Sequence, residues 1–280
     1  MKDTYTLLID CADETGLVAK VTNILFDVGI NIVSNDEFVC ERSGIFYMRT
    51  EFSGDFRRDV VIGQLQQALP ASANIRLAPK DRKKIVLMVT KEPYCLGDIL
   101  VRCIYGDMSA EIQAVIGNRA ELAKLVEAFG IPFHHIPADD LSREEHEAKV
   151  SDQLDQYDFD YLVLAKYMRI LTSEFTDKYT DRIINIHHSF LPAFIGANPY
   201  KQAYERGVKI IGATAHFVNQ DLDEGPIIAQ DIVHVSHSQG PSELASAGRD
   251  VEKRVLSRAL RLVLEDRVFV SGHKTVVFDG

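Results

Sequence analysis

The stretch Ile85-Val86-Leu87-Met88-Val89 decides the fold, because it is a short and unbroken apolar run. A strand with one face in water alternates apolar and polar residues, so an unbroken run is typical of a parallel strand covered on both faces. Similar runs alternate with segments of helical spacing further along the chain, and we expect strands at 111–116, 133–136, 161–164 and 183–186 and helices at 96–105, 120–129 and 142–156. This alternation predicts a doubly wound, mostly parallel, Rossmann-like α/β domain.

The segments on either side of this core complete the expected organisation. The same patterns predict later strands at 210–218 and 227–235, a long amphipathic helix at 241–264 and a terminal hairpin at 268–278. The segment 1–80 instead predicts strands at 5–9, 30–39, 45–52 and 73–77, with helices at 17–28 and 55–69. Their order, βαββαβ, is the ferredoxin-like arrangement. We therefore expect domains at 1–80 and 85–280, joined by a charged linker at 81–84.

Composition excludes several classes of protein. The formal net charge is −10, from 41 acidic and 31 basic residues, and no basic stripe stands out. This argues against nucleic acid as a main partner. No apolar run is long enough to span a membrane, so we expect a soluble, cytoplasmic protein and no membrane partner. The four cysteines have no metal-binding spacing, which indicates reduced thiols and no metal site: Cys11, Cys40, Cys95 and Cys103.

Polar side chains at the end of one predicted strand carry suitable chemistry. Asn185 and His187 are two positions apart, so their side chains leave the same face of the strand. An amide beside an imidazole can hold a developing oxyanion. Asp223 lies in the turn between the two later strands, and a carboxylate there can orient the imidazole or take a proton from water.

The wider segment resembles the folate-dependent formyltransferase family. The matching residues are Asn185-Ile186-His187, Ser189, Leu191-Pro192, Phe194, Gly196, His216-Phe217-Val218, Leu222-Asp223 and Gly225. The resemblance implies that Asn185, His187 and Asp223 form a catalytic triad. Further runs resemble one branch of this family: Thr90-Lys91-Glu92, Cys95-Leu96-Gly97-Asp98, Gly212-Ala213-Thr214-Ala215-His216 and Gly248-Arg249-Asp250-Val251-Glu252-Lys253.

The resemblance also implies a folate-binding slot after the strand at 161–164. In the family, backbone groups of a Met-Arg-Ile-Leu stretch meet the pterin edge, and apolar walls enclose the ring. The residues that would form this slot are Leu164, Met168, Arg169, Ile170 and Leu171, with Val218, Asp221 and Leu222 opposite. The alternative for such an apolar run is core packing.

Three further residues near the motif are weaker candidates. His188 follows the catalytic histidine, but strand alternation predicts that it points the other way. His216 is expected either to form a hydrogen bond within the site or to be a structural histidine. Lys166 is expected either to meet the glutamate tail of a folate or, more simply, to be solvated.

The segment 1–80 resembles an ACT domain, a small regulatory module. The matching residues are Asp13, Gly16-Leu17-Val18, Gly29 and Asn31-Ile32. The resemblance implies an effector loop formed by Asp13, Gly16, Leu17 and Asn31 that would take an amino acid; the alternative is an assembly domain with an empty cleft. Because so small a domain is marginal alone, and paired sheets hide an edge, we expect a homo-oligomer.

The loop that follows the expected strand at 85–89 indicates which acceptor takes the formyl group. Family members that formylate a phosphorylated ribosyl amine carry a glycine-rich loop here, whose N–H groups cradle the phosphate. This chain has no Gly-x-Gly at that position; Glu92 adds negative charge and Pro93 removes a donor. Water is then the simplest acceptor.

Over essentially its whole length, the chain resembles a branch of this family with an ACT domain ahead of the formyltransferase domain. The resemblance implies hydrolysis of 10-formyltetrahydrofolate to formate and tetrahydrofolate, which supplies formate to one-carbon metabolism and purine biosynthesis. The folate is the substrate, and no cofactor is expected. The alternatives are formyl transfer to a non-phosphorylated amine and a non-catalytic folate or amino-acid sensor.

Overall fold

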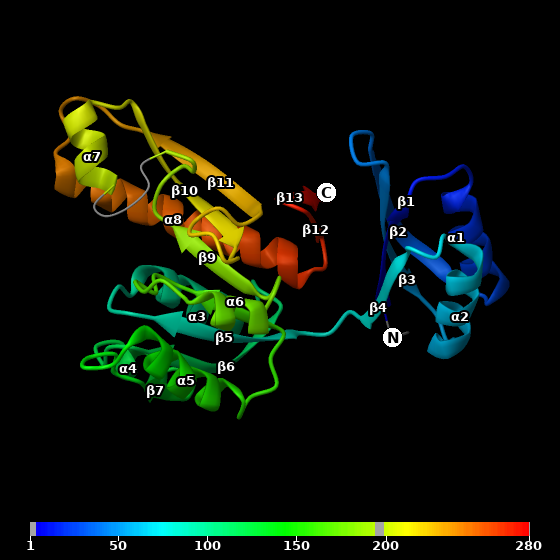
Figure 1. Ribbon diagram of the computed structural model, residues 1–280, viewed down its shortest axis with the longest axis horizontal. Coiled ribbons are helices and arrows are strands. Elements are labelled where there is room, and N and C mark those ends of the chain that lie inside the picture. The colour runs from blue at the N-terminus through cyan, green and yellow to red at the C-terminus, as the bar shows by residue number, and fades with distance from the viewer. Residues whose placement is uncertain (1–3, 194–198, 280) are drawn as a thin grey trace. The chain divides into compact units, whose positions relative to one another are not determined.

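The computed structural model describes residues 4–193 and 199–279. The chain forms two compact units (Figure 1). Of the described residues, the first unit comprises 4–81, 265–269 and 276–279, and the second comprises 82–193, 199–264 and 270–275. Two residues of the formyltransferase motif, Phe194 and Gly196, lie outside the described residues.

The first unit has the predicted βαββαβ order. Its described elements are β1 (Thr4–Ala12), α1 (Leu17–Asp27), β2 (Asn31–Cys40), β3 (Ile45–Ser53), α2 (Arg58–Ala68) and β4 (Asn74–Pro79). The strands form an antiparallel sheet in the order β2-β3-β1-β4. Alternation along β1 sends Leu7, Ile9 and Cys11 into a core shared with α1 and α2. The ferredoxin-like prediction is confirmed.

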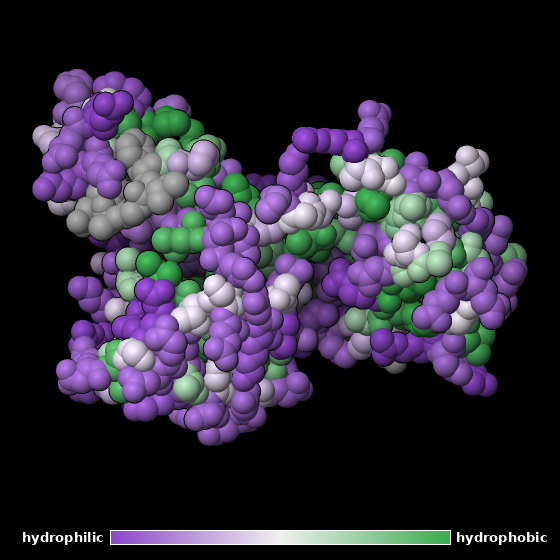
Figure 2. All heavy atoms as spheres, in the orientation of Figure 1, coloured by the Kyte–Doolittle hydropathy of each residue, from purple (hydrophilic) through white to green (hydrophobic). Residues whose placement is uncertain are grey.

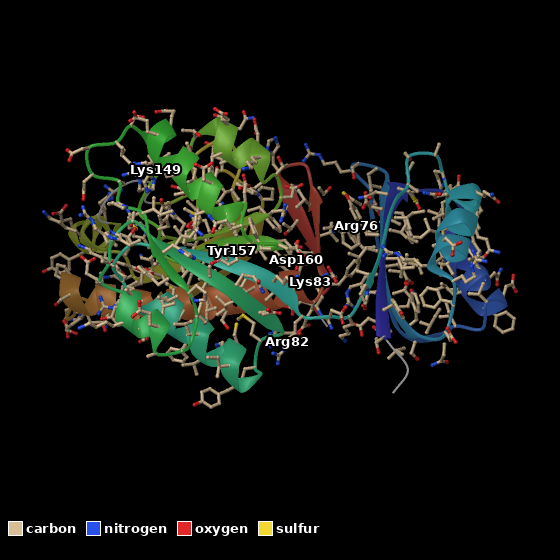
Figure 3. The ribbon with its side chains drawn as sticks, turned by 90° about the horizontal axis from the view of Figure 1, so that it is seen from below. Arg76, Arg82, Lys83, Lys149, Tyr157 and Asp160 are labelled. Atoms are coloured by element: carbon tan, nitrogen blue, oxygen red, sulfur yellow. The ribbon has the colours of Figure 1, made fainter. Side chains whose placement is uncertain are left out.

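The end of the chain contributes to this first unit. After the last helix, β12 (Val268–Ser271) and β13 (Lys274–Val277) form the predicted hairpin. Phe269 packs with Leu8 and Tyr47 in a buried cluster on the second face of the sheet. Arg76, labelled in Figure 3, places its guanidinium 5.8 Å from the centroid of the Phe269 ring. The structure therefore divides the chain differently at this end from the expected 85–280 domain.

The second unit contains a seven-stranded sheet within the described residues, in the order β11-β10-β9-β8-β5-β6-β7. The strands are β5 (Lys83–Val89), β6 (Ala110–Gly117), β7 (Phe133–His135), β8 (Tyr161–Leu164), β9 (Ile183–His187), β10 (Ile210–Phe217) and β11 (Ile227–His234). From β7 to β9 the neighbours are parallel, whereas β10 is antiparallel to both β9 and β11. The mostly parallel α/β prediction is confirmed.

Helices cover both faces of this sheet (Figure 1). They are α3 (Tyr94–Tyr105), α4 (Ala123–Glu127), α5 (Arg143–Leu154), α6 (Ser173–Lys178), α7 (Pro199–Arg206) and α8 (Pro241–Leu264). Residues of α5 and α6 pack into one core with β5 and β8, and α3 packs against α8. The short helices α6 and α7 were absent from the sequence prediction. With the apolar strands covered, the visible surface of this unit is mostly hydrophilic (Figure 2).

The change in strand order positions the site. Strand β5 lies between β6 and β8. The next strands, β6 and β7, are added on one side of β5, and the later strands from β8 onward are added on its other side. Asp160, labelled in Figure 3, holds the start of β5 to β8, because its Oδ2 accepts a hydrogen bond of 2.7 Å from the Lys84 N–H. Ligands bind beyond the carboxyl ends of strands at such a switch point. The ends of β5, β8 and β9 are therefore where a site is expected.

Within the described residues, no helix is both long and apolar enough to cross a bilayer.

Candidate active site

A cavity of about 750 Å³ lies where β8 and β9 end. It is bordered by the turn between β10 and β11 and by α7 and α8. All three members of the proposed triad line it, together with His216. The structure thus brings together side chains from the end of β9 and from the turn after β10.

The amide of Asn185 is oriented by a buried histidine on the neighbouring strand. Asn185 and His216 are directly opposite in the antiparallel pairing of β9 and β10. The Asn185 Nδ2 lies 3.2 Å from His216 Nε2, and His216 Nδ1 lies 2.8 Å from the Phe217 carbonyl oxygen. Because a carbonyl only accepts, Nδ1 carries the hydrogen and Nε2 accepts from the amide. Burial lowers the pKa of His216, which favours this neutral form.

His187 and Asp223 form a close pair. The His187 Nδ1 lies 3.2 Å from Asp223 Oδ1, and both side chains are largely buried. The His187 Nε2 is buried and has no hydrogen-bond partner in the described part of the chain, so it is the nitrogen available to a substrate. Burial raises the pKa of Asp223, but the hydrogen bond from His187 and the nearby histidines outweigh it, and the net pKa is lowered. Asp223 is therefore an ionised carboxylate at neutral pH.

The turn that carries Asp223 depends on a glycine. Asp223 has a φ of 59°, in the left-handed region that aspartate tolerates better than most residues. A Cβ atom on Gly225 would overlap the Phe217 carbonyl oxygen, which no adjustment of a side chain can relieve. Only glycine lets the chain pass this close to the end of β10. The glycine two positions after the aspartate in Leu-Asp-x-Gly therefore allows the turn that holds Asp223 against His187.

The lowered pKa of Asp223 predicts a pH-dependent contribution to stability. Because the folded pKa lies below the ordinary 3.8, the contribution is present above that pH and is lost as the pH falls through the folded pKa. Urea unfolding followed by circular dichroism should show wild type losing more stability than Asp223→Asn between about pH 5 and pH 3. Asp221→Asn is the control, since Asp221 is exposed on the same turn. Parallel curves for wild type and Asp223→Asn would contradict the assignment.

The expected folate residues all line the cavity. They are Leu164, Met168, Arg169, Ile170, Leu171, Val218, Asp221 and Leu222. Met168, Ile170 and Leu222 are 55%, 48% and 52% exposed, so core packing does not explain them. The Met168 N–H donates to Thr90 Oγ1 at 3.0 Å, which fixes the loop after β8. The cavity therefore has one wall on which apolar side chains are exposed to a ligand.

Two expectations for the weaker candidates were wrong. His188 was expected to point away, yet it lines the same cavity, because β9 ends at His187 and alternation does not continue past it. Burial lowers the pKa of His188 to about 3, so this imidazole is neutral. Lys166 was expected to be solvated, but its side chain is only 5% exposed and its Nζ lies 3.0 Å from Glu252 Oε2.

Comparison with known proteins decides the family. Residues 83–260 match the formyl transferase family and residues 5–70 match the ACT domain family. A formyltetrahydrofolate deformylase of Escherichia coli (strain K12) is 55% identical over 267 residues, which cover 95% of each chain. One from Haemophilus influenzae is 54% identical and covers 99% of this chain and all of its own. The chain belongs to the formyltetrahydrofolate deformylase family.

Solved structures of this deformylase family share the whole fold. The formyltetrahydrofolate deformylase of Pseudomonas syringae pv. tomato has a TM-score of 0.95 at 41% identity and covers 100% of this chain and 95% of its own. A glycinamide ribonucleotide transformylase from Symbiobacterium toebii has a TM-score of 0.68 at 32% identity and covers 74% of this chain and 98% of its own. The formyltransferase fold is therefore common to both, whereas the transformylase matches only part of this chain.

Two further residues that line the cavity of this deformylase-family chain, Tyr200 and Glu252, could not be given a role from the sequence. Glu252 is 1% exposed and accepts a hydrogen bond from the Tyr200 hydroxyl. Gly248 allows this contact, since a Cβ there would overlap the Tyr200 ring. The sequence did contain an indication of this contact, because Glu252 is a charged residue on the buried face of α8, between Gly248 and Leu256. A charged residue on such a face requires a partner.

The remaining site predictions concern the ACT unit and metals. In the effector loop, Leu17 is 2% exposed and belongs to the core, while Asp13, Gly16 and Asn31 are exposed. Effector binding stays a prediction. No group of histidine, cysteine or acidic side chains within the described residues is arranged to hold a metal. Burial raises the pKa of Cys95 to about 12 and that of Cys103 to about 11, so these thiols are protonated.

Proposed function

We propose that this chain hydrolyses 10-formyltetrahydrofolate to formate and tetrahydrofolate. The observation that carries the proposal is the Asn185, His187 and Asp223 constellation in one cavity, in a chain that matches formyltetrahydrofolate deformylases over nearly its full length. An amide, an imidazole and an ionised carboxylate are the groups that hydrolysis of an N-formyl bond requires. We further propose that the enzyme acts in the cytoplasm, supplies formate to purine biosynthesis and needs no cofactor or metal.

The folate would bind along the apolar wall of the cavity. A pterin presents a flat ring with a donor and acceptor edge, which suits backbone groups flanked by apolar side chains. The loop from Met168 to Leu171 supplies the backbone groups, and Leu222 supplies an apolar contact from the other side. This arrangement directs the N10-formyl group toward the ends of β8 and β9.

The formyl carbon would then be attacked by water. Attack forms a bond from the water oxygen to carbon and turns the carbonyl into an oxyanion, which the second N–H of Asn185 and the protonated His187 Nε2 stabilise. The ionised Asp223 stabilises the imidazolium before the attack, and it takes the proton of the water as the bond to carbon forms. Collapse of the tetrahedral species breaks the bond from carbon to N10, and N10 takes the proton. The products are formate and tetrahydrofolate.

The loop after β5 supports water over a phosphorylated acceptor. Glu92 lines the cavity at this loop, and Pro93 precedes α3 where a phosphate-binding loop would need backbone donors. A carboxylate beside a phosphate would repel it, and proline donates no hydrogen bond. The negative charge and the missing donor therefore disfavour a nucleotide-like acceptor.

The test of the proposed reaction is an assay for formate with purified protein and 10-formyltetrahydrofolate alone. We expect formate and tetrahydrofolate in equal amounts and no requirement for an amine. Formylated product that appears only on addition of an amine would identify a transferase. Folate binding with no formate released would identify a sensor.

An apolar contact with the folate predicts a defect in binding. Ile170→Ala should raise KM about tenfold and leave kcat nearly unchanged, since loss of a partly buried aliphatic contact costs about 1.5 kcal/mol. Steady-state kinetics measures the two constants. Ile104→Ala is the matched control, because Ile104 is 49% exposed on α3 and Ile170 is 48% exposed. An equal KM for both variants would place the folate elsewhere.

We also propose that the ACT unit assembles the chain into a homo-oligomer and takes an amino-acid effector. Strand β2 lies at an edge of its sheet, and Val33 and Phe38 on it are 62% and 46% exposed. An edge strand with exposed apolar side chains pairs readily with a second copy. Sedimentation of the protein, alone and with a panel of amino acids, measures both properties; a monomer under all conditions would reject the assembly.

A further inference from the structure

The lining of the cavity contains a buried ion pair, formed by residues that are not among the expected folate contacts. The Lys166 Nζ lies 3.0 Å from Glu252 Oε2, and the two side chains are 5% and 2% exposed. The second carboxylate oxygen, Oε1, accepts a hydrogen bond from the Tyr200 hydroxyl. Both oxygens of Glu252 are thus engaged. A buried carboxylate is rarely left unpaired, so removal of Lys166 would leave a strong site for another cation.

The backbone conformation at residue 166 would favour glycine, which indicates that the lysine is present for the contacts of its side chain. Lys166 has a φ of 64°, in the left-handed region that glycine adopts freely. The other non-glycine residues with positive φ in the described chain are all aspartates: Asp140, Asp181, Asp223 and Asp266. Aspartate tolerates this conformation, whereas a long lysine gains nothing from it locally. The contact that accompanies this conformation is the pairing of Lys166 with Glu252.

The position of the pair bears on the acceptor of the formyl group. A folate bound along Met168 to Leu171 and Leu222 would leave the rest of the cavity lining for an acceptor, and that remainder includes His188, Tyr200 and Glu252. Glu92 and Glu252 are carboxylates in that remainder, and Glu252 is the one that already pairs with an ammonium, that of Lys166. Lys166 already supplies an ammonium to it from within the chain. Lys166 is held against Glu252 and is only 5% exposed, so it is not free to move to the formyl carbon and take the formyl group itself.

We propose that Lys166 determines the acceptor specificity, by occupying Glu252 so that no substrate amine binds there and water remains the nucleophile. This inference rests on the proposed hydrolysis. Without Lys166, an amine would bind at Glu252 as its ammonium, would release one proton to solvent, and would then use the freed nitrogen lone pair to form a bond to the formyl carbon. The bond from carbon to N10 would break, the amine nitrogen would lose a proton to Asp223, and N10 would take that proton. The products would be a formamide and tetrahydrofolate.

The test uses Lys166→Gly and a small primary amine, glycinamide, as the probe. Wild type with 10-formyltetrahydrofolate should release formate whether or not glycinamide is present. Lys166→Gly should also produce N-formylglycinamide, measured by mass spectrometry, at a rate that rises with glycinamide and exceeds the wild-type level at least tenfold. Formate release by Lys166→Gly with N-formylglycinamide at the wild-type level would overturn the inference.

Two further measurements test whether Glu252 is the amine site. Glycinamide should raise the melting temperature of Lys166→Gly and leave that of wild type unchanged, which reports binding without turnover. The double variant Lys166→Gly with Glu252→Gln should lose both the stabilisation and the formyl transfer. Equal transfer by the single and double variants would reject Glu252 as the amine site. If Lys166→Gly does not fold, Lys166→Asn serves in its place, since asparagine also adopts positive φ.

Different results would reject the proposed hydrolysis and the proposed role of Lys166. Absence of formate from wild type would reject the hydrolysis, whatever the variants do. Formate from wild type without transfer by the folded variants would reject only the role of Lys166.

Discussion

Asp223→Asn should lower kcat about 10⁴-fold, the largest effect expected from a single substitution in this chain. The amide cannot take a proton from water, and it does not stabilise an imidazolium at His187, 3.2 Å away. In hydrolases that pair a histidine with an aspartate, the same exchange lowers kcat by about 10⁴. Stopped assays of formate over hours measure so slow a rate.

The control for this result is a carboxylate outside the cavity. Asp250 lies exposed on α8 and pairs with Lys253 at 2.7 Å. Asp250→Asn should keep kcat within about twofold, as surface pairs contribute little. Near-normal hydrolysis by Asp223→Asn would show that another group takes the proton.

Asn185→Ala should lower kcat about 10²- to 10³-fold while KM stays nearly constant. The amide contributes one hydrogen bond to the oxyanion, which is absent from the ground state, and loss of one such donor costs this much in other enzymes. The ratio of effects on kcat and KM distinguishes a role in the transition state from one in binding.

A different pattern would change the role of Asn185. The same amide holds His216, whose Nε2 lies 3.2 Å from Nδ2. If KM rises together with the fall in kcat, Asn185 acts mainly by fixing the end of β10. A melting temperature equal to that of wild type would exclude general unfolding as the cause.

The fold could be predicted from the sequence wherever periodicity was strong. Unbroken runs such as residues 85–89 indicated the parallel strands, and alternation in β1 indicated the sheet of the first unit. Helices α6 and α7 were missed because they have only six and eight residues, too few to display a helical period. Phe269 could not be assigned to the first unit, since its partners Leu8 and Tyr47 lie near the opposite end of the sequence.

The site was predictable where a motif held its members close together. The family resemblance named Asn185, His187 and Asp223, and the structure brings them to one cavity. The pairing of Lys166 with Glu252 could not be predicted, because it joins a loop after β8 to the middle of α8. The direction of His188 was mispredicted because strand alternation was extended past the end of β9.

The inclusion of residues 265–269 and 276–279 in the first unit has a consequence for how the chain folds as it is synthesised. The sheet from β1 to β4 leaves the ribosome before the second unit, but the aromatic cluster on its second face lacks Phe269 until α8 has also been made. Because more than one covalent connection joins the units, a single proteolytic cut between residues 81 and 82 would not separate them. Any exchange of the first unit between proteins would need a crossover near residue 81 and another near residue 264.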